Sequence, residues 1–218
     1  MEIPNVQTTT GLINRIKELF KNPRNFFNNV KVDGENQSKV FSGFYLPLLI
    51  ISFAVSLILS ILFGAIGFSS HFPRVLGFTT YPIGIILTYS IVFSILTAAL
   101  WVGMVFIMNI VINAFAPNFG GKQNNDNSFK VAAYSAVPGL LALMINYMPI
   151  VGILGSIAAI VFSVYFLYLG LQILMESPAD KVTVYTIVVI LIEVVIAFVI
   201  GLVIAAITGA LILSSVFY

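Results

Sequence analysis

The chain has 218 residues, of which 60% are hydrophobic and 8% charged, and its formal net charge is +2. A soluble globular domain usually carries about a quarter charged residues, so this composition excludes that class and indicates an integral membrane protein. The sequence contains no cysteine, which excludes disulfide bonds and thiolate metal sites.

Residues 1–42 are polar and basic, and we expect them to form a cytoplasmic N-terminal segment. Between Gly11 and Val30 apolar residues recur at helical spacing opposite basic ones, which predicts an amphipathic helix that Pro23 divides into two pieces. Its basic face suits anionic headgroups or a partner protein; the alternative is a juxtamembrane linker that only enforces topology. The candidate membrane-surface or partner contacts are Arg15, Lys17, Lys21, Arg24, Phe26 and Phe27.

Residues 43–218 are expected to form an all-α bundle of five transmembrane helices. Four apolar stretches are long enough to cross about 30 Å of hydrocarbon, and a fifth, from Val131 to Met148, is shorter and interrupted by Pro138-Gly139. The five predicted spans are Phe44 to Ile66, Ile83 to Ala114, Val131 to Met148, Ile150 to Leu174 and Val182 to Leu213.

The basic residues predict the orientation of the bundle. With five spans and a cytoplasmic N-terminus, nine of the ten Lys and Arg residues face the cytoplasm, whereas a four-span topology places Lys181 outside. The C-terminal Tyr218 is then external, and the Gly- and Asn-rich stretch from Pro117 to Lys130 is a flexible cytoplasmic loop. We expect the plasma membrane of a prokaryote.

One carboxylate, Glu193, lies inside a predicted span. At a rise of 1.5 Å per residue it is about 16 Å from Val182, near the midplane. The same count brings Ser56, Ser163 and Tyr165 to similar depth, and none of these neighbours is basic. The predicted intramembrane polar site therefore consists of Glu193, Tyr165, Ser163 and Ser56, with two readings open: a protonated glutamate that joins helices, or a group that binds or moves a proton, a cation or a polar headgroup.

Small residues continue the helical face of Glu193. They occur at Ala197, Gly201, Ala205 and Gly209, and the preceding span has its own series at Gly155, Ala159 and Ser163. Such residues let helices approach closely, so we expect these two faces to pack against each other.

The third predicted span contains a break. Its residues Tyr134, Ser135, Pro138 and Gly139 predict a kink or a broken helix, because proline and glycine free backbone carbonyls. Such breaks line cavities in transporters and also occur as static packing features. Trp101, the only tryptophan, lies near the middle of the second span, which favours packing over an interfacial role.

The order of several short motifs resembles that of prokaryotic Yip-domain proteins, relatives of the Rab/Ypt-interacting membrane proteins. The resemblance extends from about residue 11 to 213. The motifs are Asn22-Pro23-Arg24-Asn25-Phe26-Phe27, Phe119-Gly120-Gly121, the stretch Phe129 to Pro138, Met148-Pro149-Ile150-Val151-Gly152, Leu169-Gly170-Leu171 and Ala179-Asp180-Lys181.

This resemblance implies a five-span domain with a cytoplasmic N-terminus and an adaptor role in membranes. The Asp-Leu-Tyr-Gly-Pro element that precedes the first span in eukaryotic members is missing; the stretch from Gly43 to Pro47 is only weakly similar to it. The resemblance therefore does not extend to GTPase binding.

We therefore expect a non-enzymatic membrane organiser or adaptor; the competing class is a small transporter or channel that uses Glu193. No catalytic motif, metal site or cofactor is predicted. The expected partners are the lipid bilayer, a membrane or cytoplasmic protein and a second copy of the chain, with no nucleic acid.

Overall fold

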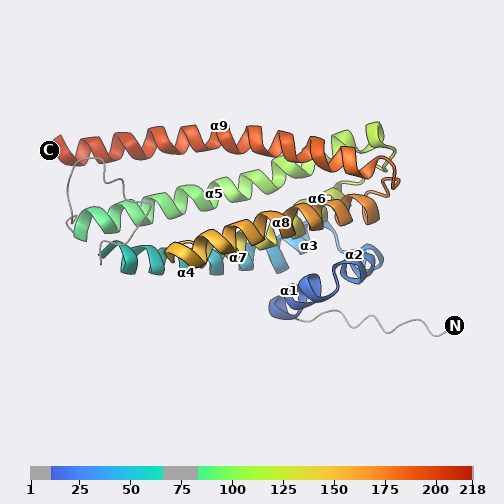
Figure 1. Cartoon of the computed structure of the whole chain (residues 1–218), viewed down its shortest axis with the longest axis horizontal. Helices are drawn as coiled ribbons and strands as arrows, with labels where there is room; N and C mark the ends of the chain where they lie inside the picture. Colours follow the sequence, from blue (N-terminus) through green and yellow to red (C-terminus); the bar gives the residue numbers. More distant parts are fainter. Residues whose placement is uncertain (1–10, 66–82, 218) are drawn as a thin grey trace.

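Apolar helices of unequal length lie side by side in the computed structural model, which describes residues 11–65 and 83–217 (Figure 1). Across these residues, four helices are long and apolar enough to cross a membrane. They belong to α4 (Leu46–Ala65), α5 (Ile83–Phe115), α8 (Pro149–Ile173) and α9 (Val182–Phe217). The first membrane-spanning stretch begins before α4, at Gln37, because α3 (Gln37–Val40) and the π-helical turn η1 (Phe41–Tyr45) lead into α4 without a loop.

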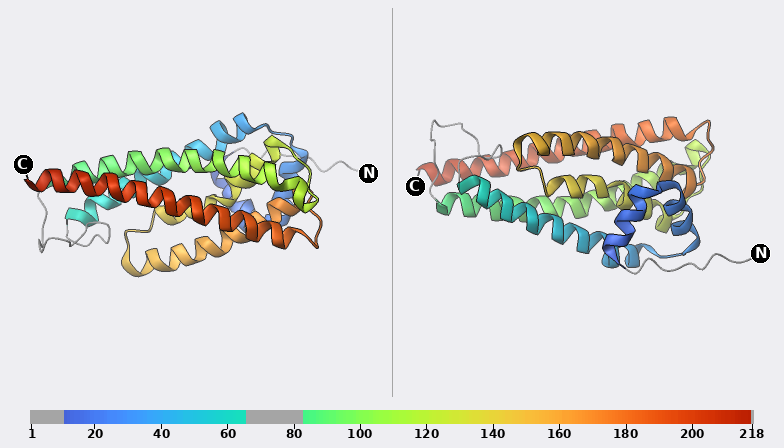
Figure 2. Two further views of the ribbon diagram at one scale, coloured as in Figure 1. Left: turned by 90° about the horizontal axis from the view of Figure 1, so that it is seen from above. Right: turned by 60° about the horizontal axis from the view of Figure 1, so that its bottom comes forward.

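The fifth predicted span does not form one long helix. It contains the end of α6 (Asn125–Ser135), all of α7 (Val137–Leu143) and a series of turns up to Met148. The break falls immediately before Pro138, which lacks an N–H and is accommodated in the first turn of α7. Both short helices pack against α8, and α6 also packs against α5 (Figure 2).

The connections α5–α6 and α8–α9 meet the N-terminal helices at one end of the bundle, which we call the polar end (Figure 1). Two helices precede α3 there: α1 (Leu12–Lys21) and α2 (Pro23–Val32). They separate at Asn22, whose side chain accepts the backbone N–H of Asn25 at 3.4 Å, while Pro23 occupies the first turn of α2.

The apolar face of α1 and α2 packs onto the bundle. Phe27 has no exposed surface and Phe26 is buried, while the ring of Phe20 meets the rings of Phe162 and Phe166 in α8, each at 5.2 Å between centroids. In this structure Phe26 and Phe27 are therefore unavailable as contacts for the membrane surface or a partner. The helical spacing predicts an apolar face, but the bundle covers it.

The predicted flexible loop from Pro117 to Lys130 is ordered. It begins with a 3₁₀ turn, η2 (Ala116–Phe119), and its last residues belong to α6. Gly120 has a φ of +72°, and Gly121 passes so close to α8's end that an added Cβ would lie 2.8 Å from the carbonyl oxygen of Met175. The two glycines are thus required by a left-handed turn and by a close backbone approach.

Lys130 lies in α6 and is only 2% exposed. Its Nζ donates to the carbonyl oxygen of Val30 at 3.3 Å, in the last turn of α2, where backbone carbonyls lack helical partners. Burial lowers the pKa of Lys130, and nearby Asp126 opposes that shift. This lysine fixes the end of α2 to α6 and is no part of a mobile loop.

Candidate functional site

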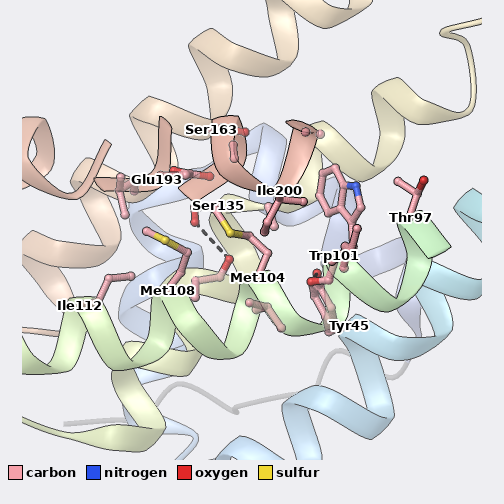
Figure 3. Close-up of a pocket in the computed structure, with 18 of the residues that line it drawn as sticks. Tyr45, Thr97, Trp101, Met104, Met108, Ile112, Ser135, Ser163, Glu193 and Ile200 are labelled. Atoms are coloured by element: carbon pink, nitrogen blue, oxygen red, sulfur yellow. Dashed lines mark hydrogen bonds between the residues drawn. The ribbon is translucent and has the colours of Figure 1, made fainter. Parts of the chain in front are cut away.

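Two adjoining cavities lie between the middle parts of the long helices. Their volumes are about 300 and 470 Å³. Residues from α5, α6, α7, α8 and α9 line both cavities, which are partly open at the surface of the protein (Figure 3). The residues common to the two cavities are Trp101, Ser135, Gly139, Ser163, Leu167, Glu193 and Ala197.

Glu193 borders both cavities from α9. In Figure 3 its side chain lies between the labelled side chains of Ser163 and Ser135. Among the described residues its carboxylate makes no hydrogen bond and no ion pair, and the residue is exposed even though it lies in the middle of a 36-residue helix. The structure thus places a carboxylate at the wall of a partly open cavity, where no described residue hydrogen-bonds to it.

The four residues of the predicted polar site do not all meet. Ser163 shares the cavity walls with Glu193, as the depth count expects. Ser56 is buried within α4 and borders neither cavity, and Tyr165 is 46% exposed on another face of α8. Depth along a helix places residues at one level but does not say toward which side they point, and this explains both differences.

The break between α6 and α7 supplies part of the cavity wall. Ser135 and Gly139 line both cavities. Tyr134 points elsewhere, into an aromatic cluster, where its ring lies 4.9 Å from that of Phe26 and 5.0 Å from that of Phe44. Its buried hydroxyl has no hydrogen bond of good geometry to any described residue, and the guanidinium of Arg15 lies close to it. Pro138 is buried and lines neither cavity.

The small-residue face of α9 leaves open space at two of its glycines. A Cβ added at Gly201 or Gly209 would meet no atom within 4 Å, and Ala197 and Gly201 line a cavity wall. On α8 a Cβ added at Gly155 would collide with the side chain of Ile145, which occupies that position. The helices α8 and α9 are in contact, but the predicted close packing of their small residues does not extend to Gly155 and Gly201.

Tyr45, Thr97 and Trp101 line a cavity although their depth along the helices did not predict them as site residues. Trp101 packs on Gly139 so closely that an added Cβ would lie 2.8 Å from the indole ring. The sequence predicts that Trp101 packs inside the bundle, which agrees with this contact, but it does not predict that the ring also lines the cavity. Helical spacing could have indicated it, since Thr97 and Trp101 are four residues apart and share a helical face.

One exposed carboxylate pairs with two separate segments at the polar end. Glu176, in the α8–α9 connection, lies 2.8 Å from Nζ of Lys31 in α2 and 2.6 Å from Nζ of Lys122 in the α5–α6 connection. These two ammonium groups lower the pKa of Glu176 from its ordinary value of 4.5 to about 2. The same residue has a φ of +55°, a left-handed conformation that glycine adopts without strain.

The variant Glu176→Gln is expected to loosen the polar end, whereas Glu176→Gly also removes the charge but relaxes the backbone. Because the folded pKa is the lower one, the ion pairs are complete above pH 4.5 and are lost as the pH falls toward 2. Trypsin cleavage at Lys31 and Lys122, measured against salt at neutral pH, checks the ion pairs. Equal cleavage of wild type and Glu176→Gln at low salt would contradict it.

Amide and hydroxyl groups extend the network toward α3. The backbone N–H of Gln37 donates to Asp126 at 2.7 Å, and the Gln37 side chain accepts from Asn125 at 2.6 Å. Asn125 in turn accepts from Asn109 of α5 at 3.1 Å, and Ser128 donates to Asn109. The start of the first membrane-spanning stretch is thereby tied to α5 and α6.

The four basic residues proposed as surface contacts divide into two pairs. Arg15 forms a bidentate ion pair with Glu35, at 2.7 and 2.9 Å, and Arg24 donates to Gln172 at 3.0 Å. Lys17 and Lys21 are exposed on α1 and form no ion pair in the described part of the chain. They are four residues apart and so share one face.

Within residues 11–65 and 83–217 no three His, Asp or Glu side chains gather where they could hold a metal ion. The family model of the Yip1 domain matches residues 17–201 of the chain, a range that includes α2, the ordered Gly120-Gly121 turn and Glu193. Neither the curated proteins nor the solved structures contain a match to this chain.

Proposed function

Because this chain belongs to the Yip1 domain family, we propose that it is a non-enzymatic membrane organiser or adaptor that offers a preformed contact surface at its polar end. The observation that supports this function best is the joining of three separate segments at that end. Phe27 and the buried Lys130 fix α2 to the bundle, Lys122 donates its N–H to Met175, and Glu176 pairs with Lys31 and Lys122 across these segments. A rigid surface loses little conformational entropy when a partner binds it.

The proposed topology has five spans, with the polar end in the cytoplasm. The α6–α7 segment then serves as a broken third span between α5 and α8, which is tolerated where the freed backbone groups are buried in protein. The distribution of Lys and Arg supports this orientation, because the polar end contains nine of the ten basic residues.

The proposed contact surface is centred on Lys17 and Lys21 of α1. Leu19 of the same helix is fully buried, so the two lysines stand on a helix anchored to the bundle. Arg15 and Arg24 are already bound to Glu35 and Gln172, and they hold the surface in place. An acidic protein surface or anionic lipid headgroups would complement the two free charges.

We expect the double variant Lys17→Glu with Lys21→Glu to abolish partner contact while folding normally, because exposed charges contribute little to stability. The measurement places a photoreactive residue at position 14, in place of Asn14, and identifies the crosslinked products that form in membranes of the native cell. The matched control is Lys39→Glu, an exposed lysine near the start of the first membrane-spanning stretch. An unchanged crosslinking pattern in the double variant would contradict the proposed surface.

A second candidate function is a small transporter or channel for a proton, a cation or a polar solute. The unsatisfied carboxylate of Glu193 at the cavity wall is the observation that favours it. Proteoliposomes should then show proton or sodium flux that Glu193→Gln removes. Flux that is absent from the wild type, or unchanged in the variant, would reject the second candidate and leave the first intact.

A further inference from the structure

The cavity wall combines one carboxylate with apolar and aromatic surface. Among the described residues no lysine, arginine or histidine borders either cavity, and Glu193 is the one charged side chain that does. Most of the remaining wall is aliphatic, methionine or aromatic, with Trp101 bordering both cavities and Tyr45 one of them. A carboxylate and an indole ring that border the same cavity both favour a positively charged ligand, because the face of the indole ring is itself negative.

The hydroxyl groups of the wall act mainly as acceptors. Tyr45 donates its hydroxyl proton to the carbonyl of Trp101 at 3.0 Å, and Thr97 donates to Phe93 at 2.6 Å. Ser135 and Ser156 likewise donate to carbonyls one turn earlier in the chain, at 3.1 and 2.8 Å. These four oxygens therefore keep lone pairs but no free proton, which favours an N–H donor as ligand, while Ser163 and Asn146 are the wall residues that can still donate.

We propose that the cavity binds a compact hydrophobic amine in its protonated form. The grounds are the Glu193 carboxylate without a hydrogen bond, the aromatic wall, and the four hydroxyl groups whose protons are already donated to backbone carbonyls. The ammonium group pairs with Glu193, and the apolar body occupies the space bordered by Trp101, Met104 and Met108. Cavities of about 300 and 470 Å³ are in the size range of small-molecule sites. The inference names the ligand class of the second candidate function and rests on that cavity, but it concerns binding and not flux.

The only tryptophan in the chain lies in the proposed site, so its fluorescence reports occupancy directly. The test is a titration of the whole protein in lipid nanodiscs with 1-adamantylamine, which is charged at neutral pH, and with 1-adamantanol, a neutral probe of nearly the same shape. Wild type should bind the amine at least about tenfold more tightly than the alcohol, because only the amine carries a positive charge that pairs with the carboxylate.

Glu193→Gln should weaken amine binding about tenfold or more and leave alcohol binding unchanged. Gly201→Leu tests the space itself, since nothing within 4 Å opposes a Cβ there and the new side chain would enter the cavity. It should weaken both probes. Gly209→Leu, on the same face of α9 but outside both cavities, is the matched control and should weaken neither.

Three results would overturn the proposal: equal affinity of wild type for amine and alcohol, an amine affinity that Glu193→Gln does not change, or equal effects of Gly201→Leu and Gly209→Leu. Should Glu193→Gln fail to fold, as judged by size-exclusion chromatography, the two glycine variants and the two probes still decide the question. Because binding is measured without a gradient, its failure is distinguishable from a failure of the flux assay.

Discussion

Phe27→Ala is expected to lower the free energy of unfolding by about 3–5 kcal/mol, the range for deleting a buried aromatic side chain. Phe27 has no exposed surface, and its ring meets that of Tyr134 at 6.2 Å between centroids. It also lies against the backbone of α8, 3.4 Å from where a Cβ on Gly170 would be. Its removal leaves a cavity where α2, α6 and α8 meet, and α2 loses its main attachment.

Two measurements separate global from local effects of Phe27→Ala. An SDS titration in mixed micelles, followed by Trp101 emission, measures the stability of the bundle, and trypsin cleavage at Lys21 and Lys31 reports detachment of α1 and α2. The control is Phe198→Ala, the same chemical change on α9 at a residue that is 66% exposed. Phe198→Ala should have little effect on either measurement, and equal losses in the two variants would contradict the packing described.

The second large effect is expected from Gly121→Ala. The new Cβ would lie 2.8 Å from the carbonyl oxygen of Met175, a backbone atom that also accepts the N–H of Lys122 at 2.7 Å. Rotating a side chain cannot relieve the clash, because the Met175 oxygen belongs to the backbone, and moving that oxygen would strain its hydrogen bond to Lys122. Overpacking and the strained hydrogen bond together should cost about 2–4 kcal/mol.

Gly103→Ala is the matched control for Gly121→Ala. A Cβ at Gly103 meets nothing within 4 Å, and alanine is the better helix former, so that variant should be neutral or slightly more stable. The SDS titration checks both, together with trypsin cleavage at Lys122. If Gly121→Ala unfolds at the same SDS fraction as wild type, the close approach of the two connections is not present in solution.

Sequence patterns predict the helices well, because membrane-spanning length and proline positions act locally. The break before Pro138 and the start of α2 at Pro23 follow from the missing N–H of proline. The position of Glu193 in the site could also be predicted locally, because a carboxylate within an apolar run costs free energy in a membrane whatever surrounds it. The count of residues along the helices placed Ser163 at the same depth as Glu193.

The remaining features depend on which surfaces meet, and a single sequence does not contain that information. Amphipathic spacing shows that Phe26 and Phe27 share an apolar face, but the same face could meet headgroups or protein. A small residue such as Gly201 permits close approach without requiring it, and here the space beside it stays open. The burial of Lys130 has no local signal, since it arises from the position of α2 against α6.

The lengths of α5 and α9 matter for the surrounding bilayer. At 1.5 Å per residue these helices, with 33 and 36 residues, measure about 50 and 54 Å, well above the hydrocarbon thickness of about 30 Å. Each therefore extends beyond the hydrocarbon layer or tilts within it. Tilting relieves the hydrophobic mismatch only in part, so lipids beside α5 and α9 are expected to stretch, and the protein is expected to favour thick or deformed regions of membrane.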